Sequence, residues 1–470
     1  MISSVAAAAP PITTVIAPFD PTKSLSELGQ KCIRKDQLEV LDLAITKHKG
    51  RCINSTVMGG GKTFQSAAFH KHYGGERGLI IVPANRITDT VDEYLKWTNT
   101  ILIPIRSGED ARSLDFNPAT FHSNIVISID LCKTLPEILK FPWKVVVVDE
   151  AHRLRGKDSQ RGHAFLPTLH RAKYVFLLTG TPIVSAPSDV FNLLHALDPR
   201  KFHNRFQFIS QYCGAFRGKF GLEEPKVLSK EQSVKFHLML KQYMVRLKGV
   251  HNPEFKKNRH IIRIGMPSDV EFPEVPKGLT GIALEHAISQ IYLETGRLKQ
   301  PYIREHALKL IKQLPENEHA VVFYHQQVVG DDFGEYLTEN DITYIRIDGS
   351  VSQARRKELL QPLRDSQPGS ARVALLSLCS SSESIECQPG CTISIFIEMP
   401  WGGVEQAEHR IHRLGMKKDT NAYWLIAHNT FDDCMPAIAK RKKRNDTELV
   451  DGDCLLPSNK RKRDTDTFER

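Results

Sequence analysis

STVMGGGKTFQ, residues 55–65, is the stretch of sequence that decides the fold. It follows an apolar strand that begins at Cys52, and a helical run comes after it. This is the context that a phosphate-binding loop needs. Glycines let backbone N–H groups approach phosphates, Lys62 would pair with the β- and γ-phosphates, and Thr63 would hold Mg²⁺. Since Thr56 stands where the usual spacing has glycine, a glycine-rich turn without function is the alternative. The stretch predicts a strand, a phosphate loop and a helix.

A second stretch, WKVVVVDEAHRLRG at 143–156, ends an apolar strand with two carboxylates. Parallel sheets place their active sites at the carboxyl ends of strands. There Asp149 would bind Mg²⁺, and Glu150 would orient and deprotonate the attacking water. The pair could instead cap the next helix, but a phosphate loop upstream favours the catalytic interpretation.

A third stretch, FLLTGTPI at 176–183, carries Thr179 and Thr181 at the end of another expected strand. These hydroxyls suit a relay of contacts between the γ-phosphate site and a cleft. The alternative is an ordinary connection from strand to turn.

A fourth stretch, QAEHRIHRLG at 406–415, places Arg410 and Arg413 three residues apart on one helical face. In a two-lobed motor these guanidinium groups would reach across the cleft to the γ-phosphate as arginine fingers. A solvated basic helix is the alternative, so this interpretation depends on the other motifs.

Two regions alternate apolar, β-branched runs with helical stretches, which is typical of parallel α/β sheets. The first region has runs at 52–57, 79–82, 125–129, 145–148 and 174–178. The second has runs at 321–324, 342–347, 373–378, 392–397 and 423–426. The sequence therefore predicts two α/β lobes with a cleft between them.

Composition limits the class of protein. The apolar share of 41% supplies real cores, and no run of about 18 apolar residues predicts a membrane span. Nine scattered cysteines and nineteen histidines show no zinc-like spacing, which indicates a reduced intracellular protein without structural zinc. The net charge of +10 suits a polyanionic partner, although by itself it is weak support.

Taken in order, these motifs resemble the SWI/SNF-type, helicase-like ATPases of helicase superfamily two, from about residue 30 to about 436. MGGGKTFQ, DEAH, LTGTP and QAEHRIHRLG match motifs of that family, and IRIDGS at 345–350 matches a motif of its second lobe. Within the family the chain looks most like the HepA-related, annealing-helicase subgroup, partly through Glu398 before MPW. It also looks like the bare motors that some large DNA viruses encode.

The resemblance implies an α/β fold with two RecA-like parallel-sheet lobes and a helical insertion between them. The expected divisions are a disordered leader at 1–24, an ATP-binding lobe one at 25–200, a helical insertion and linker at 201–285, lobe two at 286–436 and a basic disordered tail at 437–470. In that tail KRKKR at 440–444 and KRKR at 460–463 look like a bipartite nuclear-import signal, with a merely solvated tail as the alternative.

The resemblance also assigns residues to roles. Catalysis would involve Lys62, Glu150, Gln406, Arg410 and Arg413. The nucleotide would contact Gln37, which reads adenine, and Met58, Gly59, Gly60, Gly61, Lys62 and Thr63. Nucleic acid would contact Pro83, Asn85, Ser128, Gly349 and Ser350.

Several positions depart from the family pattern. Thr56 and Val57 replace the acidic pair before the phosphate loop, and Met416 replaces a motif-six glutamine. The fifth motif is SSSESIE, in which Ser384 stands for a glycine, and WGG at 401–403 is a shortened WNPG-like stretch. Because the fifth motif couples nucleic-acid contact to the nucleotide site, these changes affect coupling more than nucleotide binding.

The expected function is a DNA-dependent ATPase that uses ATP and Mg²⁺ to translocate on double-stranded or forked DNA, remodelling or annealing it. One alternative is a strand-separating DNA or RNA helicase. Another is a hydrolysis-poor ATP switch that serves as a DNA-binding scaffold. DNA with little sequence specificity and an import receptor at 440–463 are the expected partners, with no membrane, in the nucleus or at a viral replication site. The oligomeric state stays open.

Overall fold

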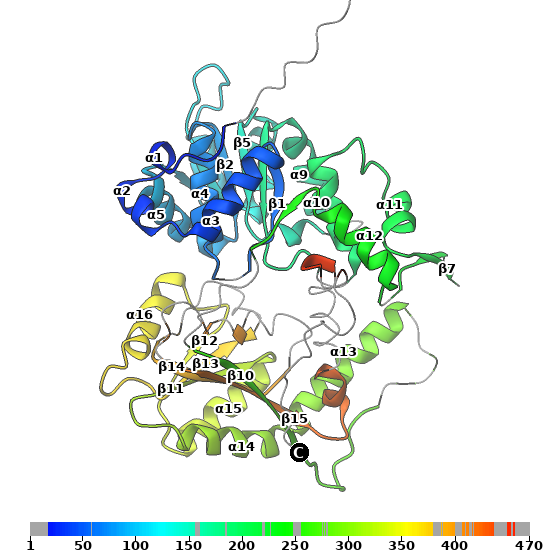
Figure 1. The fold of residues 1–470 in the computed structure, drawn as a ribbon. Coiled ribbons are helices and arrows are strands. Elements are labelled where there is room, and N and C mark those ends of the chain that lie inside the picture. Colours follow the sequence, from blue (N-terminus) through cyan, green and yellow to red (C-terminus); the bar gives the residue numbers. More distant parts are fainter. Residues whose placement is uncertain are drawn as a thin grey trace, which may run out of the picture.

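The structure is a computed structural model. It describes residues 17–57, 59–155, 160–183, 186–218, 221–225, 227–247, 255–274, 276, 278, 281–378, 387, 389–399, 407–408, 410–412, 416, 418–436, 449–452 and 455. Figure 1 shows two lobes, lobe one drawn from blue to green and lobe two from light green to orange. Each lobe is a parallel sheet with helices on both faces.

Lobe one is built on a seven-stranded sheet in the order β3-β4-β2-β5-β6-β1-β9, and all of its pairs are parallel. Its strands are β1 (Arg51–Asn54), β2 (Gly78–Val82), β3 (Ile103–Ile105), β4 (Ile125–Ser128), β5 (Val145–Val148), β6 (Tyr174–Leu178) and β9 (Met244–Val245). An antiparallel hairpin, β7 (Phe216–Gly218) with β8 (Gly221–Glu223), stands apart from this sheet.

The helices of lobe one follow in chain order. They are α1 (Pro21–Ser24), α2 (Glu27–Cys32), α3 (Lys35–Asp42), η1 (Leu43–Lys47), α4 (Lys62–His72), η2 (Ala84–Arg86), α5 (Ile87–Thr98), α6 (Gly108–Arg112), α7 (Ile129–Cys132), α8 (Pro136–Lys140), η3 (Ala151–Leu154), α9 (Gln160–Arg171), η4 (Pro187–Val190), α10 (Phe191–Leu197), α11 (Arg205–Tyr212) and α12 (Lys230–Leu240).

Alternate residues of each central strand of lobe one enter opposite cores, since side chains along a strand point to opposite faces. Val146 and Val148 of β5 lie in the core that α9 and α10 cover. Val145 and Val147 lie in the core that α3, α4 and α5 cover. A strand that is apolar on both faces must have helices on both, which is why VVVV indicates a parallel sheet.

Lobe two is built on a six-stranded parallel sheet in the order β10-β15-β14-β11-β13-β12. Its strands are β10 (Lys257–Ile264), β11 (His319–Tyr324), β12 (Tyr344–Ile347), β13 (Val373–Ser377), β14 (Cys391–Phe396) and β15 (Thr420–Ala427). Its helices are α13 (Gly281–Leu298), α14 (Gln300–Lys312), α15 (Gln327–Glu339), α16 (Gln353–Arg364) and η5 (Phe431–Cys434). Here α14 and α15 cover one face of the sheet, while α16 and part of α13 cover the other.

All ten strands that the sequence predicts are present, with ends that shift by up to three residues. The predicted two-lobed parallel architecture is confirmed. The strands that the patterns did not indicate are short or lie at sheet edges. An edge strand has a neighbouring strand on one side only, so its side chains are less uniformly apolar than those of a central strand. Pro104 in β3 fits this position, because proline cannot donate to a second neighbouring strand.

The expected helical insertion and linker at 201–285 also contains strands: besides the hairpin of β7 and β8, two segments join the sheets of the lobes. Met244–Val245 forms β9, which pairs with β1 at the edge of the lobe-one sheet. Lys257–Ile264 forms β10, which pairs with β15 along eight residues of the lobe-two sheet. The chain therefore completes lobe one and begins lobe two within this interval.

The expected disordered ends also need correction. In the leader, Phe19 is buried and its backbone N–H donates to Asp42 Oδ1 at 2.8 Å, just before α1. In the tail, Leu449 and Val450 are each 2% exposed and lie in the core of lobe one. Burial of these apolar side chains orders both short segments. The average composition of each terminus did not indicate this.

The segment Leu449–Gly452 is held on lobe one by polar contacts as well. His237 Nδ1 donates to the carbonyl of Leu449 at 3.0 Å, and the red segment lies beside α12 in Figure 1. Asp451 accepts from Arg246 Nε at 2.5 Å, and the same guanidinium donates to Ser55 Oγ at 3.0 Å. A segment that follows lobe two in the chain thus returns to the base of the phosphate loop.

The described residues contain no helix whose length and apolarity would let it span a bilayer. Among them, no group of three or more His, Cys, Asp or Glu side chains could hold a metal ion.

Candidate nucleotide site

The phosphate loop lies between the carboxyl end of β1 and the start of α4. Gly59 and Gly61 adopt φ values of 75° and 82°, which a residue with a Cβ rarely takes. Gly61 immediately precedes Lys62, the first residue of α4, so the loop opens onto a helix N-terminus. Met58 lies outside the described residues.

Three side chains hold the carbonyl oxygen of Gly60. Gln37 Nε2 donates to it at 3.1 Å, Arg34 Nη2 at 3.0 Å and Gln65 Nε2 at 3.3 Å. Gln37 is 3% exposed, and a Cβ at Gly61 would clash with its amide. Gln37 therefore lies beside the loop, and its role in reading adenine stays a prediction.

A buried polar network behind the loop was missed by the sequence reasoning. Asn54 Nδ2 donates to Gln65 Oε1 at 2.6 Å, and Thr56 Oγ1 donates to the same oxygen at 3.3 Å. All three side chains are fully buried. Thr56, which departs from the usual glycine, thus braces the loop from behind. The only sequence signal was Gln65 within the quoted motif.

The two side chains expected to meet phosphate and metal start α4. Lys62 Nζ donates to the carbonyl of Thr56 at 3.0 Å, so its ammonium lies over the loop. Thr63 Oγ1 accepts a hydrogen bond from Arg86 Nη2 at 3.1 Å. Arg86 was not among the predicted site residues.

The acidic pair lies at the carboxyl end of β5. Glu150 has a φ of 51°, a left-handed value that costs of order 1–3 kcal/mol in a residue with a Cβ. Its backbone N–H donates to Asp149 Oδ1 at 2.9 Å. The strained turn gives the two adjacent carboxylates different directions and surroundings.

The pKa values of the pair move apart. Burial, and then the charge of Glu150, raise the pKa of Asp149, although Arg86 and Lys62 act in the opposite direction. Burial alone would raise the pKa of Glu150, but the hydrogen bond from His152 and the charges of His152, Lys62 and Arg153 outweigh it and hold this pKa at about 2. Glu150 is therefore kept as a carboxylate, which can accept a hydrogen bond from water.

His152 links the acidic pair to the third motif. Its Nδ1 lies 3.2 Å from Glu150 Oε2 and 3.1 Å from Thr179 Oγ1. Thr179 is fully buried at the end of β6, and its hydroxyl oxygen accepts from the N–H of Thr181 at 3.2 Å. The second and third motifs thus meet through one imidazole, as a relay requires.

These residues come together because β5, β6 and β1 are neighbours in the sheet and β2 lies beside β5. The carboxyl ends of four parallel strands therefore share one edge. A hydroxyl and a carboxylate, from Thr63 and Asp149, are oxygen donors of the kind that Mg²⁺ takes together with phosphate oxygens. Arg86 Nη2 donates to Thr63 Oγ1, and the charge of Arg86 acts to lower the pKa of Asp149, which indicates that the two oxygen donors lie near one another. Their chemistry fits Mg²⁺ bound with a nucleotide.

The sixth motif is described in part. Arg410 is 5% exposed in lobe two, and its carbonyl accepts from the N–H of Cys387 at 3.1 Å. Gln406, Arg413 and Ser384 lie outside the described residues. The role of Arg410 and Arg413 as arginine fingers stays a prediction.

A buried ion network anchors the sixth motif two residues before Arg410. Glu408 is fully buried, and its oxygens accept from Lys257 Nζ at 3.0 Å and from Arg259 at 2.8 and 2.6 Å. Trp424 Nε1 donates to it at 3.1 Å. Burial would raise the pKa of Glu408, but Lys257 and Arg259 outweigh burial and hold it at about 2. The missed strand β10 supplies both cations.

The residues expected to contact nucleic acid occupy varied surroundings. Pro83 is buried and Asn85 is half-buried, after β2. Ser128 is 8% exposed, and its Oγ accepts from the N–H of Leu131 as the cap of α7. Gly349 and Ser350 are exposed in the turn after β12, where Ser350 Oγ donates to Asp348 Oδ1 at 2.6 Å. Whether they contact nucleic acid stays a prediction.

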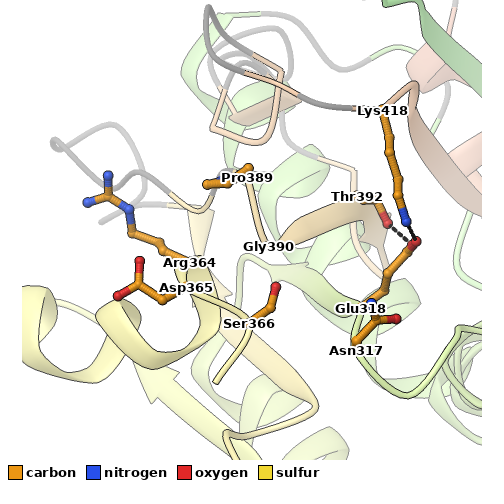
Figure 2. Close-up of a pocket in the computed structure, with 9 residues that line it drawn as sticks. All are labelled: Asn317, Glu318, Arg364, Asp365, Ser366, Pro389, Gly390, Thr392 and Lys418. Atoms are coloured by element: carbon orange, nitrogen blue, oxygen red, sulfur yellow. Dashed lines mark hydrogen bonds and ion pairs between the residues drawn. The ribbon is translucent and has the colours of Figure 1, made fainter. Parts of the chain in front are cut away.

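A pocket elsewhere on lobe two is distinct from this site (Figure 2). It lies at the amino ends of β11 and β14, and none of the quoted motif residues lines it. Figure 2 shows Thr392 and Lys418 directed at Glu318, whose carboxylate accepts from them at 2.6 and 2.5 Å. The pocket contains none of the phosphate-loop or acidic-pair residues of the nucleotide site.

Comparison with known sequences identifies two domains. The sequence model of the SNF2-related domain matches residues 37–269, and that of the helicase conserved C-terminal domain matches residues 304–418.

Two full-length relatives and one solved structure are similar to the chain. It is 28% identical over 432 residues to the Homo sapiens "DNA annealing helicase and endonuclease ZRANB3", covering 86% of this chain and 39% of that protein. It is 27% identical over 460 residues to the Xenopus tropicalis "SWI/SNF-related matrix-associated actin-dependent regulator of chromatin subfamily A-like protein 1", covering 92% and 47%. The chain thus spans less than half the length of these relatives. It is also similar to the "Sulfolobus solfataricus SWI2/SNF2 ATPase core in complex with dsDNA", with 16% identity, a TM-score of 0.43 and coverage of 94% and 96%.

Proposed function

Since this chain belongs to the SNF2-related, helicase-like ATPases, we propose that it is a DNA-dependent ATPase that translocates on double-stranded or forked DNA and remodels or anneals it. One observation carries the proposal. The phosphate loop, the acidic pair and Thr179 meet at one edge of the lobe-one sheet, joined by His152.

The residues of this edge have complementary roles in ATP hydrolysis. Lys62 neutralises charge on the β- and γ-phosphates, and Gln37 recognises the adenine. Thr63 and Asp149 would hold Mg²⁺, which when bound would supply positive charge against the phosphates. Glu150 accepts a hydrogen bond from the attacking water and orients it, while His152 holds the Glu150 carboxylate in place.

Lobe two completes the catalytic site across the cleft. We infer that Arg410 and Arg413 stabilise the charge on the γ-phosphate and that Gln406 lies with them. The Glu408 network supports this role, because it fixes the backbone just before Arg410 to the lobe-two sheet. Closure of the cleft would then be required for rapid hydrolysis.

DNA is the proposed polyanion. The net charge of +10 supports it, and so do the relatives named as a DNA annealing helicase and as a regulator of chromatin. Contacts with the DNA backbone rather than the bases, at Pro83, Asn85, Ser128, Gly349 and Ser350, would give little sequence specificity. The basic clusters at 440–463 would bind an import receptor, and the nucleus is the proposed location.

ATPase assays on matched nucleic acids test the proposal. Hydrolysis should be stimulated most by duplex or forked DNA and weakly by RNA, with ATP-dependent triplex displacement and little strand separation. Robust unwinding without triplex displacement would favour the strand-separating helicase instead. DNA binding without stimulated hydrolysis on any substrate would favour the ATP-switch scaffold.

A further inference from the structure

A chain of polar contacts runs from the proposed metal site to lobe two. Thr63 Oγ1 accepts from Arg86 Nη2 at 3.1 Å, and Arg86 Nη1 lies 3.9 Å from Asp89 Oδ2. The other oxygen of that carboxylate, Oδ1, lies 2.5 Å from Lys357 Nζ. Lys357 belongs to α16 of lobe two, so Asp89 shares its charge between a cation of each lobe.

The local sequence explains this arrangement within lobe one. Arg86 ends η2 and Asp89 is in the first turn of α5, three residues later, so their side chains lie on one face. Both side chains are largely shielded, with 24% and 16% exposed, whereas Lys357 is 61% exposed. Arg86 therefore contacts the acceptor Thr63 through Nη2 and the acceptor Asp89 through Nη1.

The two acceptors compete for Arg86 once the nucleotide site is filled. The guanidinium keeps its positive charge under all ordinary conditions. A divalent cation on the Thr63 hydroxyl would repel that charge at short range, whereas the Asp89 carboxylate attracts it. Movement toward Asp89 requires only a side-chain rotation, because the ion pair already exists at 3.9 Å.

We propose that Arg86 is a positioning residue that moves from Thr63 to Asp89 when Mg²⁺ and nucleotide bind, and thereby weakens the contact of Asp89 with Lys357. This inference rests on the proposed function and adds to it a link between nucleotide binding and lobe movement. In the absence of nucleotide, Lys357 holds α16 against the start of α5. When Arg86 takes over Asp89, lobe two is freed to turn toward the closed arrangement that hydrolysis requires.

The test compares Lys357→Ala with a control on the same helix. The side chain of Arg355 is also 61% exposed, and its described ion pair is with Glu358 of the same helix, at 3.0 Å. Arg355→Ala therefore removes a similar positive charge without changing a described contact with lobe one. Binding of N-methylanthraniloyl-ADP by the full chain is titrated with Mg²⁺ and with EDTA. Lys357→Ala should tighten binding about two- to fivefold with Mg²⁺, because a competing ion pair of typical strength is gone. It should change nothing in EDTA, and Arg355→Ala should change nothing in either.

A second variant predicts the opposite sign. Asp89→Asn removes the acceptor to which Arg86 moves, so binding with Mg²⁺ should weaken severalfold. In the double variant Asp89→Asn with Lys357→Ala, the second change should have no further effect, because its ion pair is already lost. A merely structural role for Asp89 would weaken binding equally in EDTA.

The outcomes separate the two proposals. If the native chain does not bind the fluorescent nucleotide with Mg²⁺, the proposed function fails. If the native chain binds it but Lys357→Ala behaves like Arg355→Ala, or changes binding equally in EDTA, the role of Arg86 and Asp89 as a link between the lobes is wrong.

Discussion

Replacing Glu408 by glutamine removes one negative charge from a site that is closed to water. The side chain of Glu408 is 1% exposed, and its carboxylate faces Lys257 and Arg259, which are 24% and 13% exposed. Glutamine has nearly the same volume and can still accept from Trp424 Nε1, so no cavity forms. What remains is two cations of β10 without their counter-charge.

Two independent arguments give the size of the effect. Removing one partner from a buried ion pair costs about 3–5 kcal/mol. The pKa of Glu408 falls from 4.5 to about 2 on folding, which corresponds to about 3 kcal/mol of preference for the charged form. We therefore expect Glu408→Gln to lower the free energy of unfolding of lobe two by about 3 kcal/mol at pH 7.

Urea unfolding followed by tryptophan emission measures this loss, since Trp424 contacts the altered side chain. Glu358→Gln on exposed α16 is the control and should change the free energy of unfolding by less than about 0.5 kcal/mol. Because folding depresses the pKa of Glu408, its stabilisation is present above about pH 4.5 and is lost as the pH falls toward 2. The difference between native protein and Glu408→Gln should shrink below about pH 4.5. A loss under about 1 kcal/mol at pH 7, or one independent of pH, would refute the reasoning.

Three further predictions follow from the site and the fold. Glu150→Gln should bind ATP with near-native affinity and hydrolyse it at least about a hundredfold more slowly, because only the carboxylate that orients water is lost; near-normal single-turnover hydrolysis would remove Glu150 from this role. Arg413→Ala should keep most ATP affinity and lose about a thousandfold or more in kcat, and a collapse of affinity at unchanged kcat would contradict an arginine finger. Leu449→Ala should lower the free energy of unfolding of lobe one by about 2–4 kcal/mol, because the side chain of Leu449 is 2% exposed and lies in that core. The control is Leu455→Ala: Leu455 is 49% exposed, so this change should have almost no effect in the same urea titration. Equal effects of the two leucine variants would mean that the C-terminal segment leaves lobe one in solution.

Short stretches of sequence determined most of the nucleotide site. The phosphate loop needs glycines at φ values near 80°, and VVVV needs helices on both faces of its strand. Each stretch therefore predicts its own local structure. Parallel strands then bring their carboxyl ends to one edge without further instruction. For that reason the sequence alone predicts that Lys62, Thr63, Asp149 and Glu150 share one site.

Only the tertiary structure decided which residues hold these groups in place. Arg86 meets Thr63 across 23 residues, Glu408 meets Arg259 across 149, and His237 meets Leu449 across 212. The residues next to an arginine, glutamate or leucine in the sequence do not predict which distant residue its side chain will contact. Edge strands such as β9 and β10 likewise depend on a neighbour far along the chain, since their own residues are too few or too mixed to indicate a buried strand. Local backbone conformation depends on adjacent residues, whereas the pairing of distant charges depends on how the sheets and helices pack.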